Sequence, residues 1–368
     1  MKRMLCIVAG MNAGGAETFL MKLYRGLDRA KYQMDFAVAV TEKGFYDDEI
    51  RQLGGAVYHI TPKSKGPLKS FLSIYNLVKS QKYRYVLRTA GHSLSALELF
   101  AAQLAGAKVR VFRSSNTNTT SGRRKDLLLH RICSFMPKVF SNVKLAPSTE
   151  AAEYMFGKNC VAHGKATILR NAVDLEVYCY SENHRSQIRQ AFGIKKGDVV
   201  VGHIGRFNQQ KNHAFLIDVF AEFQKKHPNA WLMLVGTGEL EEEIRREVIQ
   251  YGLEKQVIFT GVRSDVPNLL SAFDVFVFPS KYEGMPNVII EAQAASLPAV
   301  VSDSVTSEVK VTKLVRFESL NSPCVQWVDD IENVLLEGRC DCSAEMEKAG
   351  YSIASSVREF VELTYDKA

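Results

Sequence analysis

Short apolar segments of the kind that is buried in parallel sheets alternate with segments of helical periodicity along most of the chain. This alternation restricts the fold more than any other feature of the sequence. In the first half the expected strands are residues 5–9, 34–40, 56–60, 85–87, 108–112 and 142–146, and the expected helices are 16–27, 68–78, 93–104 and 126–135. Strands that alternate with helices build a mostly parallel sheet that helices cover on both faces.

The second half repeats this scheme with apolar runs that are nearly continuous. Its expected strands are 199–204, 230–235, 257–260, 275–278 and 299–301, and its expected helices are 213–224, 239–251, 267–272 and 286–295. Segment 171–196 is polar and poor in strand signals, which predicts a linker. We therefore expect an α/β protein with two Rossmann-like, doubly wound domains that face a cleft. Such sheets bind ligands at the carboxyl ends of their strands, so the active site is expected in that cleft.

Size and composition narrow the class of protein further. The 368 residues are 46% hydrophobic, enough for two ordinary cores, and no apolar run approaches the roughly 20 residues of a membrane-spanning helix. The N-terminus imitates a signal peptide, but its apolar part is short, and we interpret it as the first strand. The seven cysteines are scattered without a C-x2-C pair, which is typical of a reducing compartment and predicts a cytoplasmic protein.

Charge is distributed very unevenly between the two halves. Residues 1–170 hold 27 Lys and Arg against 11 Asp and Glu, whereas residues 171–368 hold 20 against 29. The excess in the first half indicates an anionic partner, and the charge pattern leaves open whether this is phospholipid, a phosphorylated lipid or nucleic acid. A basic face that meets only solvent is the alternative.

Two turns between a strand and a helix carry residues suited to a phosphorylated ligand. Gly14 and Gly15 open the first helix, where backbone N–H groups can approach a phosphate. Their spacing fits neither a dinucleotide fingerprint nor a P-loop, and a plain tight turn is equally compatible with it. Arg206 and Lys211 follow the strand at 199–204, five residues apart, and such a pair can clamp a diphosphate. Two solvated loop cations would give the same pattern.

A third turn contains two carboxylates, Glu283 and Glu291, which stand eight residues apart with Gly284 and Pro286 between them. Glu291 falls inside an otherwise apolar helix, where it needs a hydroxyl or a cation as a partner. The backbone amides at the start of that helix are suited to an anion. Each carboxylate could also be a structural group that the fold itself satisfies.

Four segments together resemble the signature series of the retaining family 4 glycosyltransferases, which have the GT-B fold. The segments are Gly205-Arg206 with Lys211, residues 234–238 (LVGTG), residues 259–265 (FTGVRSD) and Glu283-Gly284-Met285-Pro286 with Glu291. The resemblance extends over nearly the whole chain and is closest to bacterial capsular and exopolysaccharide biosynthesis members. It implies a hexosyltransferase with an acceptor-binding domain, residues 1–175, and a nucleotide-sugar-binding domain, residues 176–351. It also implies that the last helix, 352–368, packs back on the first domain.

The resemblance assigns roles to individual residues. Arg206 and Lys211 would neutralise the donor diphosphate and the leaving nucleoside diphosphate, and Glu283 would contact hydroxyls of the donor sugar. Glu291 would bind the ribose. The further donor contacts that it implies are Gly15, the base-binding turn of Val262 and Arg263, and the backbone of Gly284, Met285, Pro286 and Asn287. The resemblance implies no metal or other cofactor. It explains retention of the anomeric configuration without a protein nucleophile, because the leaving phosphate assists the attacking hydroxyl.

One position departs from the family pattern. Many relatives carry a histidine in the first domain where this chain has Ser115, within Arg113-Ser114-Ser115-Asn116. Ser115, Asn116 and the nearby His92 are the candidates to replace that histidine as contacts for the sugar or the acceptor. A lone histidine such as His92 is at least as often a helix cap or a packing residue.

The expected function is transfer of a sugar, with retained configuration, from a UDP-sugar to a lipid-linked glycan in capsule, exopolysaccharide or O-antigen synthesis. The basic first half predicts attachment to the inner face of the cell membrane. The apolar residues expected to insert are Leu68, Phe71, Leu72, Ile74 and Tyr75. A nucleotide-sugar epimerase of the same fold and a basic nucleic-acid-binding module are the alternatives. The intact carboxylate pair disfavours the epimerase, and the nucleic-acid module leaves Glu283 and Glu291 without a role.

Overall fold

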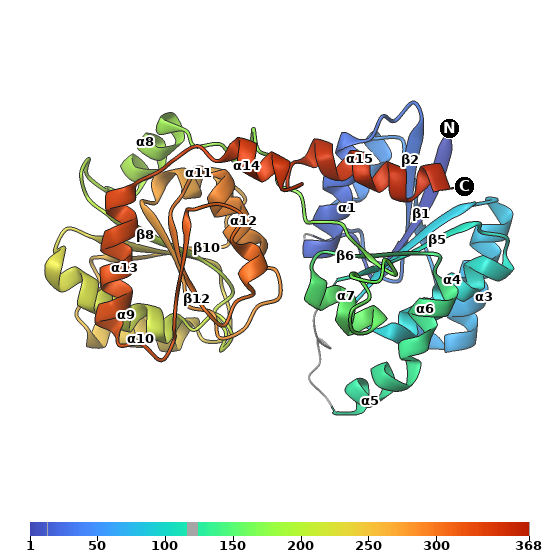
Figure 1. The fold of residues 1–368 in the computed structure, drawn as a ribbon, viewed down its shortest axis with the longest axis horizontal. Helices are drawn as coiled ribbons and strands as arrows, with labels where there is room; N and C mark the ends of the chain where they lie inside the picture. Colours follow the sequence, from blue (N-terminus) through green and yellow to red (C-terminus); the bar gives the residue numbers. More distant parts are fainter. Residues whose placement is uncertain (13, 116–123, 368) are drawn as a thin grey trace. The chain divides into compact units, whose positions relative to one another are not determined.

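The computed structural model describes residues 1–12, 14–115 and 124–367, and the chain divides into two units. Unit 1 comprises Met1–Ala172 and Ile353–Ala368, and unit 2 comprises Val173–Ser352 (Figure 1). Each unit has its own parallel sheet with helices on both faces. The predicted α/β class with two doubly wound domains is confirmed.

The sheet of unit 1 has seven parallel strands in the order β3-β2-β1-β4-β5-β6-β7. The strands are β1 (Lys2–Val8), β2 (Tyr32–Val38), β3 (Val57–His59), β4 (Tyr85–Ala90), β5 (Val109–Ser114), β6 (Val143–Ala146) and β7 (Thr167–Ile168). The helices are α1 (Gly15–Gly26), α2 (Asp47–Gln52), α3 (Pro67–Ser80), α4 (Leu97–Leu104), α5 (Arg124–Ile132), α6 (Met136–Phe140), α7 (Thr149–Phe156) and α15 (Ile353–Leu363). Short 3-10 turns are η1 (Lys63–Lys65), η2 (Ser93–Ala96), η3 (Cys133–Phe135) and η5 (Tyr365–Lys367).

Two cores lie on opposite faces of this sheet, because successive residues of a strand point to opposite sides. Cys6 belongs to one core and its neighbour Ile7 to the other. The C-terminal helix α15 contributes to the first core through Phe360 and lies close to α1. A Cβ atom on Gly26 of α1 would be only 2.8 Å from the side chain of Val357. The glycine therefore lets these two helices approach closely.

Unit 2 has six parallel strands in the order β10-β9-β8-β11-β12-β13. They are β8 (Val200–Ile204), β9 (Trp231–Val235), β10 (Val257–Gly261), β11 (Val275–Phe278), β12 (Ala299–Ser302) and β13 (Val315–Glu318). The helices are α8 (Glu182–Ala191), α9 (His213–Lys226), α10 (Glu241–Gln250), α11 (Val266–Ala272), α12 (Asn287–Ala294), α13 (Cys324–Glu337) and α14 (Ser343–Lys348), with a 3-10 turn η4 (Ser307–Val309). The neighbours β8 and β11 both end at the edge that carries the candidate donor residues.

The prediction of a linker at 171–196 is wrong. From Val173 onward the segment belongs to unit 2, and its helix α8 packs against α11. Arg185 and Arg189 of α8 both bind the carboxylate of Asp274, with N–O distances of 2.6 and 2.5 Å. The helix also buries the apolar side chain of Ile188 beside the paired Arg189, so its polar sequence is compatible with close packing and is no sign of a free linker.

The expected insertion segment on α3 is only partly exposed. Leu68 and Leu72 have exposed fractions of 71% and 46%, but Ile74 is fully buried in the core beneath α3. The prediction for Ile74 is therefore wrong, since its side chain lies on the inner face of the helix. Among the helices of the described residues, none is both long enough and apolar enough to cross a membrane.

Candidate active site

The turn after β8 is held against the turn after β9 by backbone contacts. The N–H of Gly205 donates to Val235 at 2.9 Å, and the N–H of Phe207 donates to Thr237 at 3.1 Å. A Cβ atom on Gly238 would lie 2.3 Å from the carbonyl oxygen of Phe207, which no side chain can do. The glycine of this motif is thus required by the close approach of two backbones. The result is a fixed base for the loop that carries Arg206 and Lys211.

Lys211 and Glu283 meet directly at the carboxyl ends of β8 and β11. The Nζ atom of Lys211 lies 2.6 Å from Oε1 of Glu283, and the two side chains are only 17% and 13% exposed. The same ammonium group lies 4.5 Å from the ring centroid of Phe278, the last residue of β11. A cation held between a carboxylate and an aromatic face has a restricted position. Of the residues expected to act on the donor, these two are in contact.

Gln210 joins the same two loops through its backbone and its side chain. The backbone carbonyl of Gln210 accepts from the N–H of Lys281 at 2.8 Å. Its side-chain Nε2 donates to the backbone carbonyl of Tyr282 at 2.9 Å. Sequence reasoning did not identify Gln210, because a glutamine in a polar loop carries no distinctive pattern. Together with the ion pair, these bonds make the loops after β8 and β11 one connected structure.

Arg206 and Glu291 have other partners. Arg206 binds Glu239 at 3.2 Å, and these side chains are 71% and 56% exposed, so the pair is held weakly. Glu291 is the fifth residue of α12 and interacts with the hydroxyl of Tyr178. Burial and this nearby carboxylate raise the pKa of Tyr178 above its ordinary value. Glu291 thus has the hydroxyl partner that its position in an apolar helix requires.

The remaining donor candidates lie on the turn after β10 and at the start of α12. Val262 is 78% exposed, whereas Arg263 forms two hydrogen bonds with Asp265, at 2.8 and 2.7 Å. This pairing lowers the pKa of Asp265 and uses the carboxylate that would otherwise cap α11. Residues 284–286 precede α12, and its N-cap residue, Pro286, makes no side-chain hydrogen bond to the backbone amides of the first turn.

Two buried histidines lie beneath the loop after β8, and the sequence analysis gave them no role. Nδ1 of His203, on β8, donates to the carbonyl of Val277 at 2.8 Å, and the ring centroid of His203 lies 4.6 Å from that of His213. Within the described part of the chain, Nε2 of His203 and both ring nitrogens of His213 have no hydrogen-bond partner. Burial lowers the pKa of His203 to about 4 and also lowers that of His213. Both rings are therefore neutral supports of the loop at neutral pH.

The candidates of unit 1 lie at the carboxyl ends of its own strands. Gly14 is the N-cap of α1, and Gly15 is its first residue. Nδ1 of His92 accepts from the N–H of Leu94 at 3.1 Å and caps η2, which is the capping role considered above. The N–H of Ser115 donates to Ala90 at 3.2 Å. Asn116 lies outside the described residues.

Arg113, next to these residues at the end of β5, is almost completely buried. It donates to Oδ1 of Asn171 at 2.5 Å and lies 3.8 Å from the ring centroid of Phe19. Burial lowers the pKa of this guanidinium to about 9. Arg113 therefore packs within unit 1.

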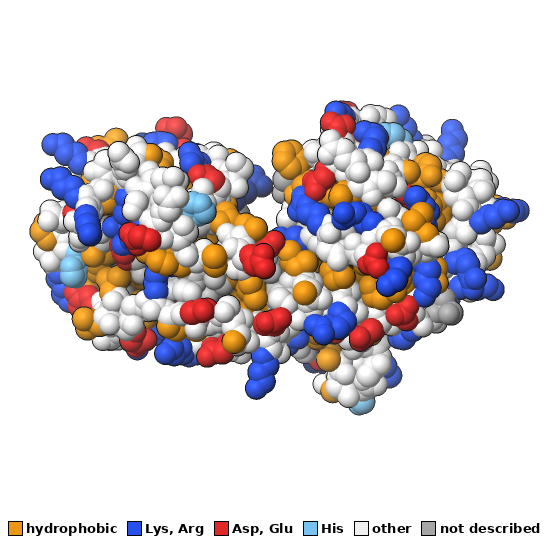
Figure 2. Space-filling model, turned by 90° about the horizontal axis from the view of Figure 1, so that it is seen from above, with side chains coloured by type: hydrophobic (Ala, Val, Ile, Leu, Met, Phe, Trp, Pro, Cys, Tyr) orange, Lys and Arg blue, Asp and Glu red, His pale blue; other side chains and the backbone are white. Residues whose placement is uncertain are grey.

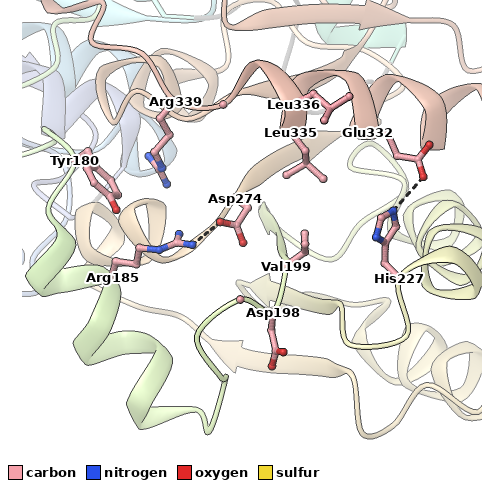
Figure 3. A pocket seen from close by; sticks show the side chains of 12 residues that line it. Tyr180, Arg185, Asp198, Val199, His227, Asp274, Glu332, Leu335, Leu336 and Arg339 are labelled. Atoms are coloured by element: carbon pink, nitrogen blue, oxygen red, sulfur yellow. Dashed lines mark hydrogen bonds and ion pairs between the residues drawn. The ribbon is translucent and has the colours of Figure 1, made fainter.

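A separate cavity of about 710 Å³ lies at the opposite edge of the unit 2 sheet (Figure 3). Its wall includes Val199 and Asp274, which directly precede β8 and β11, so it is at the amino ends of these strands. The charged residues in its wall are already paired, for example His227 with Glu332 at 3.0 Å. In parallel sheets of this kind ligands bind at the carboxyl ends, which favours the loops of Lys211 and Glu283. No group of three or more His, Cys, Asp or Glu side chains among residues 1–12, 14–115 and 124–367 is arranged to hold a metal ion.

Comparison with known sequences shows which proteins the chain is similar to. A family model for glycosyl transferases group 1 matches residues 184–314, which contain Arg206, Lys211, Glu283 and Glu291. The chain is 34% identical over 343 residues to a putative glycosyltransferase, EpsF, of Bacillus subtilis (strain 168), covering 92% of this chain and 89% of that protein. It is 28% identical over 305 residues to the UDP-Gal:alpha-D-GlcNAc-diphosphoundecaprenol alpha-1,3-galactosyltransferase of Escherichia coli, covering 78% and 79%.

A solved structure shows the same fold over almost the full length. HepE of Anabaena, in complex with UDP, matches 98% of this chain and 94% of its own with a TM-score of 0.71 and 21% sequence identity. This likeness confirms the expected GT-B fold. With the relative from Bacillus subtilis matched over most of both chains, the protein belongs to the glycosyl transferases group 1 family and is a glycosyltransferase.

Proposed function

We propose that the protein transfers a sugar from a UDP-sugar to a lipid-linked glycan that carries a diphosphate, with retained configuration at the anomeric carbon, in capsule or exopolysaccharide synthesis. The observation that carries the proposal is the buried contact between Lys211 and Glu283, which the bonds of Gln210 hold in place. The named relative from Escherichia coli supports the donor and acceptor classes, because its name specifies UDP-Gal and a diphosphoundecaprenol acceptor.

In the reaction, the bond between the anomeric carbon and the diphosphate oxygen breaks, and negative charge accumulates on the leaving UDP. Lys211 stabilises this charge from a position that is set before the donor arrives, which is the condition for efficient electrostatic catalysis. Glu283 contacts hydroxyls of the donor sugar with Oε2, the oxygen atom that does not bind Lys211 in the ion pair. Arg206 exchanges Glu239 for the diphosphate, since its present partner holds it weakly.

The acceptor hydroxyl attacks the same face of the sugar from which UDP departs. Its proton passes to the departing phosphate oxygen, and the new glycosidic bond forms without a covalent enzyme intermediate. Glu291, with Tyr178 beside it, binds the ribose, and Val262 with Arg263 contacts the base. Gly15 and the backbone of 284–287 approach the diphosphate, and His92, Ser115 and Asn116 are the candidates on the acceptor side.

We further propose that unit 1 attaches the enzyme to an anionic membrane surface. Its residues include 29 Lys and Arg against 14 Asp and Glu, whereas unit 2 has 18 against 26. On the face of unit 1 that Figure 2 displays, Lys and Arg side chains outnumber Asp and Glu. Each cation near an anionic leaflet adds on the order of 1 kcal/mol, so several of them give useful binding. A lipid-linked acceptor would then be met at the surface where it resides.

The test measures nucleoside diphosphate release with UDP-, GDP- and ADP-sugars in the presence of an undecaprenyl diphosphate glycan. We expect release from UDP-sugars only, and NMR of the product should show the anomeric configuration of the donor. Glu283→Gln should reduce release by about a hundredfold or more. Glu222→Gln is a matched control, because Glu222 pairs with Lys225 on the exposed face of α9. Absence of release with every donor, or an inverted product, would contradict the proposal.

A further inference from the structure

One helical stretch of unit 1 exposes a continuous row of large apolar side chains. Helix α5, the turn η3 and helix α6 follow one another without a gap from residue 124 to residue 140. The row consists of Leu128, Ile132, Phe135 and Val139, which are 60%, 63%, 51% and 62% exposed. Their spacing of four, three and four residues places them on one side of a helix. We call these four residues the α5–α6 ridge.

The opposite side of the same stretch anchors it to the unit. The ring of His130 stacks on Tyr154 at a centroid distance of 4.3 Å and accepts or donates at Nδ1 with the hydroxyl of Ser93 at 2.7 Å. Phe140 stacks on Phe100 of α4 at 4.7 Å. The stretch is therefore attached by one side and presents the ridge on the other. Soluble proteins seldom expose several large apolar residues in a row unless they meet a partner.

Charge identifies the kind of partner. Arg131 and Lys138 lie on the stretch itself and are exposed. Between residues 99 and 149 the chain has nine Lys and Arg and a single acidic residue, Asp126. Apolar side chains flanked by cations fit the interface of a bilayer that contains anionic lipid. A second copy of the chain is a poorer occupant, because a symmetric contact through the ridge would bring Arg131 and Lys138 of both copies together.

We propose that the α5–α6 ridge is the element with which unit 1 inserts into an anionic bilayer. The inference rests on the proposed function, in that it names the part of unit 1 that meets the membrane. The ridge is favoured over the expected segment on α3, where Leu68 and Leu72 are the exposed apolar residues and Ile74 is buried. Figure 1 shows α5 at the periphery of unit 1, away from its sheet.

The experiment measures partition of the full-length protein to sedimented vesicles of phosphatidylcholine, with or without about one third phosphatidylglycerol. The ridge variant is Leu128→Ser/Ile132→Ser/Phe135→Ser. The matched control is Ile249→Ser/Val325→Ser/Leu336→Ser, since these unit 2 residues are 58%, 52% and 87% exposed. We expect the ridge variant to lose at least about tenfold in partition to anionic vesicles and the control to stay within about twofold. Circular dichroism should show both variants folded.

Further outcomes separate this inference from the proposed transferase reaction. With a short, water-soluble diphosphate acceptor the ridge variant should keep the activity of the unmodified enzyme, and with an acceptor embedded in vesicles it should lose activity. If vesicle binding needs the ridge but no sugar is transferred, the proposed reaction fails and the inference stands. Equal partition of the ridge variant and the control would overturn the inference. A change from dimer to monomer in sedimentation velocity, with vesicle binding unaltered, would also overturn it.

Discussion

The two units share one strand order over six strands, to which unit 1 adds β7, but they use the strand ends differently. In each unit the first strand lies inside the sheet, and the fourth strand of the unit lies beside it, so β1 and β4 correspond to β8 and β11. In unit 2 the loops after these two strands are joined by the contact of Lys211 with Glu283. In unit 1 the polar side chains after β1 and β4 accept hydrogen bonds from backbone N–H groups. Asn12 accepts from Phe45, and His92 accepts from Leu94.

The comparison shows that fold alone does not supply the chemistry. A sheet of this kind offers a ligand site at the strand ends, and the loop residues decide what the site can do. Unit 2 has a buried, preorganised cation and a net negative composition, whereas unit 1 has a basic composition and exposed apolar residues. We infer that the transfer step depends chiefly on unit 2 and membrane attachment on unit 1.

The largest effect that would test this comparison is expected from Lys211→Met. The variant removes the cation and keeps much of the side-chain volume, so kcat/KM for the UDP-sugar should fall about a thousandfold, or ~4 kcal/mol. His92→Ala in unit 1 should cost less than about tenfold, because His92 caps a local turn. Lys225→Met on the exposed face of α9 is the control. A loss for His92→Ala as large as that for Lys211→Met would reverse the assignment of roles.

The contrast between the units also explains what could be predicted from sequence. The expected strands and helices are all present, because buried strands and amphipathic helices have strong periodic patterns. The strand β7 was missed because it has only two residues, and β13 because Arg316 and Glu318 interrupt its apolar run. The sequence does not predict helix α8, because it buries a single apolar residue, Ile188, and its other contacts are made by Arg185 and Arg189.

The candidate site was likewise predicted only in part from the sequence. Glu283 and Lys211 were found from their motifs, but their direct contact depends on how two distant loops fold together. Gln210, Phe278 and Tyr178 were missed because a loop glutamine, a strand phenylalanine and a tyrosine outside the motifs have many ordinary roles. Their importance follows only from three-dimensional contacts with Lys281, Lys211 and Glu291.

A second test concerns the rigidity of the unit 2 loops. In Gly238→Ala the new methyl group would stand 2.3 Å from the backbone of Phe207, so we expect a loss of about 3 kcal/mol in the free energy of unfolding. Both tryptophans of the chain, Trp231 and Trp327, belong to unit 2, so their fluorescence follows that unit during urea unfolding.

The comparison variant for this test is Gly106→Ala in unit 1. Gly106 has a positive φ of 102°, but nothing lies within 4 Å of the position of a Cβ atom. Its cost should be about 1 kcal/mol, which circular dichroism can measure. An equal loss for the two variants would show that the loops of unit 2 are no more tightly packed than a surface turn of unit 1.

A third, smaller effect is expected from acid. Because burial lowers the pKa of His203 from 6.5 to about 4, the unfolded chain binds a proton between these pH values and the folded chain does not. The free energy of unfolding therefore decreases as the pH falls below 6.5, with up to about 1.4 kcal/mol per pH unit from this residue. His203→Leu should reduce the slope by that amount when tryptophan fluorescence is followed in urea. Well above pH 6.5, where His203 is neutral in the folded and the unfolded chain, the same substitution should leave the slope unaltered.

The smallest effect, and the one with the most informative sign, is expected from Glu239→Gln. Glu239 competes with the donor diphosphate for Arg206, and the exposed pair contributes little stability, so the free energy of unfolding should change by less than about 0.5 kcal/mol. Titration calorimetry should show UDP binding about two- to fivefold more tightly to Glu239→Gln, and about tenfold more weakly to Arg206→Ala. If UDP affinity rises in Glu239→Gln and falls in Arg206→Ala, Arg206 must leave Glu239 to bind the donor. Weaker UDP binding in both variants would mean that the intact pair is itself part of the site.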